Sequence, residues 1–143
     1  MAKKYDSGSS LQAKILKGVD ILADNVASTL GPRGRNVILH QKGSNPIITK
    51  DGVTISKFVD LEDPFENAGA QIIKQVAART ADDCGDGTTT STVLARAILQ
   101  EAQKYIVAGS SPVELKRGMD KTVVAIVDNL EKNSNPISSV EDI

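Results

Sequence analysis

The feature that most constrains the fold is a glycine- and threonine-rich stretch, residues 84–90 (Cys-Gly-Asp-Gly-Thr-Thr-Thr), between two long amphipathic patterns. Glycines on both sides of Asp86 allow positive φ angles and a close approach of the backbone to a ligand. The threonines open a helix, whose first turn has unpaired N–H groups and the positive end of the helix dipole. Because a carboxylate repels a bare phosphate, Asp86 indicates a Mg²⁺ ion shared with a nucleotide. A plain helix–loop–helix turn explains the same residues, and the stretch alone leaves both interpretations open.

Four long segments have the apolar spacing of amphipathic helices, which predicts a mainly α fold, a bundle of long helices. The segments are residues 10–30, 64–84, 90–109 and 112–135. The first is expected to begin at a Ser9 or Ser10 cap and to end at Leu30, before a glycine–proline stop.

Two of these helices begin with the same capping pattern. Asp63 is expected as an N-cap, with Pro64 at the first helical position and Glu66 completing a capping box. Residues 111–114 (Ser-Pro-Val-Glu) repeat the arrangement. Gly69, beside the apolar face of its helix, is expected to let a neighbouring element approach closely.

A small β-hairpin is predicted between the first two long helices. Residues 36–40 and 46–49 are β-rich and are separated by a polar loop. A lone hairpin is marginal in water, so its edges are expected to pair with the N-terminal segment or with a neighbouring chain. The polar start is compatible with a short edge strand around residues 3–6, and residues 53–61 fit either a strand or a short helix.

The composition is that of a globular domain and argues against several function classes. The chain has 143 residues, of which 40% are hydrophobic and 24% are charged. A net charge of −1 and an aromatic content of 3% argue against nucleic acid or an anionic membrane as the partner. The start lacks the apolar core of a signal peptide, and one cysteine fits a reducing compartment, so we expect a cytoplasmic location.

Cys84 and His40 are the remaining candidates for chemistry. Each is the only residue of its kind in the chain, which argues against a disulfide and a zinc site. Cys84 is therefore expected as a small packing residue, since free cysteines are usually buried.

Several sequence blocks occur together in a fixed order. They are residues 29–36 (TLGPRGRN), 49–53 (TKDGV), 61–63 (LED), 85–90 (GDGTTT) and 115–118 (LKRG). Together they resemble the group I chaperonins, the GroEL-type family, over nearly the whole chain. The resemblance implies that residues 1–134 are the N-terminal part of an equatorial, ATP-binding and ring-forming domain. Residues 135–143 would then be the truncated start of the intermediate hinge domain.

The resemblance also implies a site for ATP and Mg²⁺. The ATP-binding residues that it implies are Thr29, Leu30, Gly31, Pro32, Lys50, Asp86, Gly87, Thr88, Thr89 and Thr90. Asp86 would be the metal ligand, and Asp51 would be catalytic, because it would position or polarise the water that attacks ATP. The family places a second carboxylate opposite Asp51 on a return segment that this sequence does not contain.

The function implied by the resemblance is that of an ATP-dependent chaperone subunit. In the full-length protein, hydrolysis of Mg·ATP would drive the enclosure and refolding of unfolded polypeptides. The implied partners are identical subunits in a double ring, a co-chaperonin and the polypeptide clients. The alternative is a truncated interaction module that docks into chaperonin rings without ATP turnover of its own.

Overall fold

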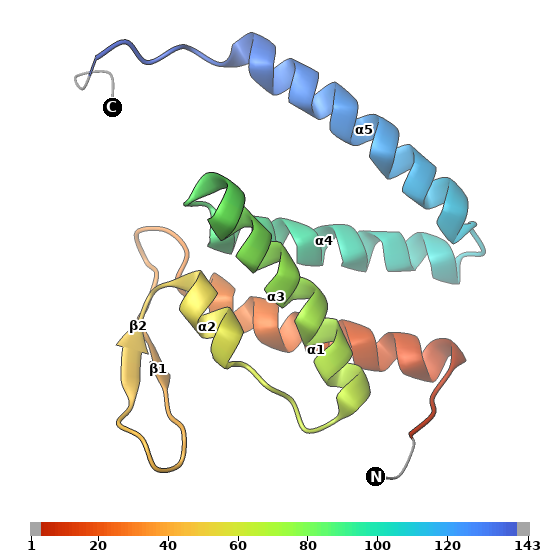
Figure 1. Cartoon of the computed structure of the whole chain (residues 1–143). Helices are drawn as coiled ribbons and strands as arrows, with labels where there is room; N and C mark the ends of the chain where they lie inside the picture. Colours follow the sequence, from red (N-terminus) through yellow and green to blue (C-terminus); the bar gives the residue numbers. More distant parts are fainter. Residues whose placement is uncertain (1–3, 140–143) are drawn as a thin grey trace. The chain divides into compact units, whose positions relative to one another are not determined.

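The computed structural model describes residues 4–139, and these residues are mostly helical (Figure 1). The elements are α1 (Gly8–Ala27), β1 (Val37–Leu39), β2 (Ile47–Thr49), α2 (Gly52–Phe58), α3 (Pro64–Cys84), α4 (Thr88–Val107) and α5 (Pro112–Asn133). The chain divides into a first unit that ends at Glu101 and a second that begins at Ala102. The predicted fold class, a mainly α structure of long helices with a small β-hairpin, is confirmed.

The crossing of α1 and α3 is the main helix–helix interface of the first unit (Figure 1). The two backbones touch at two glycines. A Cβ atom at Gly18 would overlap the carbonyl oxygen of Glu66, and one at Gly69 would overlap the carbonyl oxygen of Ile15. Only glycine fits at such a contact, because there is no room for a methyl group. The expectation for Gly69 is confirmed, whereas Gly18 was not singled out from the sequence.

The apolar core lies where α1, α2 and α3 meet. Its fully buried members are Val19, Leu22, Val26, Ile55, Ala70 and Ile73. The α1 residues recur at helical spacing, so one stripe of that helix faces the core. Ile55 is the contribution of α2, which makes this short helix part of the core.

The first half of α4 is held against α1 by both apolar and polar contacts. Ala95 of α4 packs against the core. The Arg96 guanidinium forms an ion pair with Asp24 of α1. The Gln100 side-chain amide donates to Asp20, again on α1, over 2.7 Å. These contacts tie the middle of α4, residues 95–100, to α1 within the first unit.

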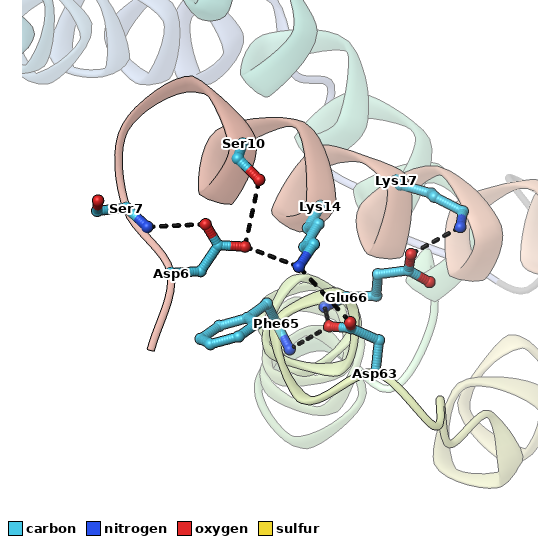
Figure 2. A network of polar contacts seen from close by, with 8 residues as sticks. All are labelled: Asp6, Ser7, Ser10, Lys14, Lys17, Asp63, Phe65 and Glu66. Atoms are coloured by element: carbon cyan, nitrogen blue, oxygen red, sulfur yellow. Dashed lines mark hydrogen bonds and ion pairs between the residues drawn. The ribbon is translucent and has the colours of Figure 1, made fainter. Parts of the chain in front are cut away.

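A polar network joins the start of α1 to the start of α3 (Figure 2). Lys14 Nζ lies 2.7 Å from Asp6 Oδ2 and 3.8 Å from Asp63 Oδ2. The Lys14 ammonium also lies 5.1 Å from the centroid of the Phe65 ring. Because such surface pairs are worth little energy, the network orients the first turn of α1 more than it stabilises the fold.

Asp63 caps α3 as predicted. Its Oδ1 accepts hydrogen bonds from the backbone N–H groups of Phe65, at 2.8 Å, and Glu66, at 3.1 Å. The expected capping box is wrong in its second half. The Glu66 carboxylate accepts from Lys17 Nζ of α1 over 2.6 Å instead, which adds a second tie between the two helices (Figure 2).

The boundaries of α1 differ from the prediction. The helix begins at Gly8 and ends at Ala27, and the N–H of Leu30 then bonds the Ala27 carbonyl over 3.0 Å. This three-residue spacing is typical of a tightened last turn. The apolar spacing therefore continues to Leu30, three residues beyond the end of the α-helix. Residues 4–6 have no strand conformation, and residue 3 of the expected edge strand lies outside the described residues.

The hairpin is antiparallel, with Val37 opposite Thr49. Ile38 and Ile48 are 67% and 65% exposed, and among residues 4–139 no third strand pairs with the hairpin. The segment 53–61, which fits either a strand or a helix in sequence, provides most of α2.

The second unit contains α5, none of whose residues is buried. Its large exposed apolar residues are Val113, Met119, Val123, Val124, Ile126, Val127 and Leu130. Ser111 is the N-cap and Pro112 the first helical residue, as predicted, but the Ser111 side chain makes no capping hydrogen bond. Residues 134–139 have no regular structure, and residues 140–143 of the expected hinge segment lie outside the described part.

Within the described chain, no helix is both long and apolar enough to cross a membrane.

Replacing Gly69 by alanine is expected to force α1 and α3 apart, since the new methyl group meets a backbone carbonyl. The free energy of unfolding should fall by roughly 3 kcal/mol. Gly118→Ala is the matched control, because nothing lies within 4 Å of its added Cβ and alanine favours a helix by about 1 kcal/mol. Urea unfolding followed by circular dichroism measures both variants, and equal midpoints would contradict the close crossing.

The Asp63 cap makes a pH-dependent contribution to stability. Hydrogen bonds from the Glu66 and Phe65 backbone N–H groups hold the pKa of the Asp63 carboxyl below its ordinary 3.8. The stabilisation is therefore complete above the unfolded-state pKa and is lost as the pH falls through the lower folded-state pKa. Asp63→Asn keeps an acceptor at the N-cap without titrating there. Its melting temperature should fall less steeply than that of the wild type below about pH 4, and parallel curves would refute this role.

Candidate functional site

The glycine- and threonine-rich stretch forms an exposed corner between α3 and α4. Gly85 ends α3 with a left-handed φ of 75°, and Gly87 has a φ of 82°. Both angles would strain any residue that carries a Cβ atom. Asp86 is exposed between them, and its Oδ1 accepts from the Gly87 N–H over 2.6 Å. The backbone geometry predicted for these two glycines is confirmed.

The three threonines occupy the first three positions of α4, as predicted. The Thr88 carbonyl accepts from the hydroxyls of Ser91, at 3.0 Å, and Thr92, at 2.8 Å. In the first turn of a helix the backbone N–H groups have no intrahelical acceptor. The start of α4 therefore presents donors and the positive end of the helix dipole at the exposed corner.

Gly52 is the point where α1, α2 and α4 meet. A Cβ atom on Gly52 would lie 3.0 Å from Thr89 Oγ1, 3.1 Å from Thr88 Oγ1 and 3.2 Å from Val26 Cγ1. Three segments that are far apart in the sequence thus converge on one buried glycine. As a result, Asp51 is one residue away from a direct contact with the threonine hydroxyls.

Asp51 is the N-cap of α2, a role that the sequence analysis missed. Its Oδ2 accepts from the Thr54 N–H, at 2.8 Å, and from the Thr54 hydroxyl, at 2.5 Å, while its Oδ1 accepts from the Val53 N–H at 3.4 Å. The Thr54 hydroxyl has the largest effect on the pKa of the Asp51 carboxyl and holds it below its ordinary value. Burial opposes this shift, and the two N–H groups and Lys57 add smaller lowering effects. The side chain is therefore an ionised acceptor at neutral pH.

The turn after α1 lies next to this convergence through Val26. The Thr29 hydroxyl donates to the Val26 carbonyl over 2.7 Å, and Gly31 has a left-handed φ of 72°. Leu30 and Pro32 are exposed on the turn. The turn is thus exposed and follows directly on the helix residue, Val26, that packs against Gly52.

The structure joins some of the predicted site residues and leaves others apart. The side chains of Val26, Thr88 and Thr89 pack closely around Gly52. This packing brings together the segments that hold Thr29, Asp51 and Thr90. Lys50 and Asp86 are both exposed. Among residues 4–139, no hydrogen bond or ion pair links Lys50 or Asp86 to another candidate segment.

The donor set fits a metal ion that is bound together with phosphates. No cluster of three or more His, Cys, Asp or Glu side chains that could hold a metal occurs among residues 4–139. Mg²⁺ is commonly held by one or two carboxylates with phosphate and water oxygens, and the exposed Asp86 beside a helix start suits that arrangement. Asp86 is thus the residue of the corner that could hold a metal ion, together with phosphate and water oxygens.

The expectation that Cys84 is a buried packing residue is wrong. Its side chain is exposed, because it lies in the last turn of α3 where the chain leaves the core. The sequence carried a signal for this exposure, since the apolar stripe of α3 ends near Ala77 and two charged residues, Asp82 and Asp83, stand directly before Cys84.

Together these features define a helical module with an exposed glycine–threonine corner and a capped carboxylate beside it. The model of the TCP-1/cpn60 chaperonin family matches residues 22–142, which include both the turn after α1 and the corner. The chain belongs to this chaperonin family, and its function is of the chaperonin type. The roles of individual residues toward ATP and Mg²⁺ stay predictions.

Proposed function

We propose that the chain is part of an ATP-dependent chaperonin subunit, in which hydrolysis of Mg·ATP drives the enclosure and refolding of unfolded polypeptides. The single observation that best supports this function is that the hydroxyls of Thr88 and Thr89 pack so closely around Gly52 that a Cβ atom there would lie 3.0 to 3.1 Å from them. The residue that follows Asp51 in the chain therefore packs against the start of α4. Phosphoryl transfer to water requires a hydrogen-bond acceptor that orients the water and a group of donors that binds the phosphates. The Asp51 carboxylate and the start of α4 could provide them.

The phosphates of ATP would lie against the first-turn N–H groups of α4, at the positive end of the helix dipole. Mg²⁺, when bound, would neutralise part of the phosphate charge, with Asp86 as its protein ligand. Lys50 would add a further positive charge near the phosphates. The turn that contains Thr29, Leu30, Gly31 and Pro32 would contact the nucleotide from the end of α1.

Asp51 would act on the water molecule. Its ionised carboxylate accepts a hydrogen bond from the water and orients the water oxygen toward the γ-phosphorus. As the new phosphorus–oxygen bond forms, the bond from the γ-phosphorus to the bridging oxygen breaks and its electron pair leaves with ADP. The proton that the water loses passes to the phosphate product, directly or through Asp51, and ADP and phosphate are released. Catalysis of this kind depends on positioning and charge stabilisation rather than on a covalent intermediate.

The assembly belongs to the same proposal. Residues 1–134 would form part of the equatorial, ring-forming domain, and residues 135–143 would begin the intermediate hinge domain. Identical subunits in a double ring, a co-chaperonin and unfolded polypeptides would be the partners, in the cytoplasm. The exposed Ile38, Ile47 and Ile48 of the hairpin and the exposed apolar residues of α5 support an assembly of several chains, because large exposed apolar surfaces mark interaction sites.

The metal role of Asp86 predicts a specific loss. Mg·ATP should raise the melting temperature of the chain by mass action, and Asp86→Asn should weaken Mg·ATP binding about tenfold. Asp83→Asn is the matched control, since it removes the same charge from an exposed residue three positions earlier. Differential scanning fluorimetry with and without Mg²⁺ separates the two variants. An equal effect of the two substitutions, or no response of the wild type, would contradict the site.

A second function is favoured by α5, a long helix with no buried residue among its 22 residues. In this alternative the chain is an interaction module that docks into the rings of a full-length chaperonin and does not turn over ATP itself. Mixing the chain with full-length chaperonin subunits and separating the products by size-exclusion chromatography tests it. Co-elution without ATP turnover by the chain would support the module, and separate elution would eliminate it.

A further inference from the structure

The position of the Asp51 carboxylate is set by two threonines that have no assigned role. The Thr54 hydroxyl donates to Asp51 Oδ2 over 2.5 Å, and the Thr54 N–H donates to the same oxygen over 2.8 Å. On the other side, the Asp51 N–H donates to the Thr49 hydroxyl over 3.0 Å. Hydrogen bonds therefore hold both the backbone and the side chain of Asp51.

The two carboxylate oxygens of Asp51 are engaged unequally. Oδ2 accepts two short hydrogen bonds from Thr54, whereas Oδ1 accepts one long bond, of 3.4 Å, from the Val53 N–H. Each oxygen of an ionised carboxylate accepts about two hydrogen bonds. Oδ2 is therefore saturated, and Oδ1 keeps the larger remaining capacity to accept from a water molecule.

We infer that Thr54 is a positioning residue for hydrolysis, because its hydroxyl anchors Oδ2 of Asp51 and leaves Oδ1 as the oxygen that accepts from the attacking water. This inference rests on the proposed ATPase function and adds to it a residue that does not touch the nucleotide. The geometry explains how one aspartate both caps a helix and remains available for chemistry. The first role uses mainly one oxygen and the second role uses the other.

The surroundings of Asp51 contain few other charges that could set its ionisation. Lys57, one turn along α2, is the charged side chain that contributes, and its effect is the smallest of the five causes. From α1 and α4, the groups at the neighbouring Gly52 are Val26, Thr88 and Thr89, all of them uncharged. The largest effect on the pKa of the Asp51 carboxyl comes from the Thr54 hydroxyl. Removing that hydroxyl should therefore change the titration of Asp51 more than removing any single charge.

The first measurement uses the chain without nucleotide. The carboxyl ¹³C shift of Asp51 is followed by NMR from about pH 2 to about pH 7, a range that spans the ordinary carboxyl pKa. Thr54→Val should move the Asp51 titration to higher pH, and Thr54→Ser, which keeps the hydroxyl, should restore the wild-type curve. Thr122→Val is the control, since that hydroxyl bonds only a helix carbonyl of α5, at 2.8 Å. If only the backbone N–H of Thr54 held the Asp51 carboxylate, Thr54→Val would leave the Asp51 titration unchanged. That outcome would overturn the inference.

The second measurement compares kcat and KM for ATP hydrolysis. It uses the protein as it is expressed from its natural gene. Thr54→Val should lower kcat by roughly tenfold to a hundredfold and leave the KM for Mg·ATP unchanged, because a misplaced water slows the chemical step. Thr54→Ser should recover most of kcat. A raised KM with unchanged kcat would overturn the positioning role alone. No turnover by the wild-type protein would overturn the proposed function, and the role of Thr54 in hydrolysis would fall with it.

Discussion

The close crossing of α1 and α3 is the constraint on which the first unit depends. Gly18 and Gly69 bring the two backbones into contact, and no larger residue fits at either position. This contact lets Ile55 of α2 reach the core between the two helices and become fully buried. Once Ile55 is fixed, the start of α2 lies against the first turn of α4. The candidate site is therefore a consequence of core packing, since Gly52 meets the threonine hydroxyls only if α2 is held in this place.

The candidate site combines structural and chemical roles in the same residues. Asp51 stabilises the start of a short helix that is too short to persist alone, and the hydrogen bonds that cap the helix also fix the carboxylate. A fixed acceptor beside a helix start loses little freedom when a ligand arrives, which is the physical basis of preorganised catalysis. Asp86 differs, because it is exposed on a glycine-bounded corner, where a metal ion and its phosphates can approach from solvent.

Local sequence signals predicted the features that depend on neighbours in the chain. The four long helices, the Asp63 cap and the positive φ angles around Asp86 all follow from spacing, capping chemistry or the absence of a Cβ atom. Gly69 was predicted as a point of close approach, but its partner, Ile15 of α1, was not. Long-range contacts could not be predicted in this way. The contacts of Gly18 and Gly52 depend on where distant segments meet. The Asp51 cap was missed because a helix of seven residues is too short to show a clear apolar period.

The most direct test of the account is an NMR titration of the isotopically labelled chain with Mg·ATP. The central claim is that the start of α2 and the start of α4 bind one and the same nucleotide. If so, addition of Mg·ATP changes the amide shifts of residues 50–54 and 86–90 together, with the same apparent Kd, and the changes in residues 86–90 require Mg²⁺. Shifts confined to one segment, or two segments that titrate with different Kd values, would contradict it.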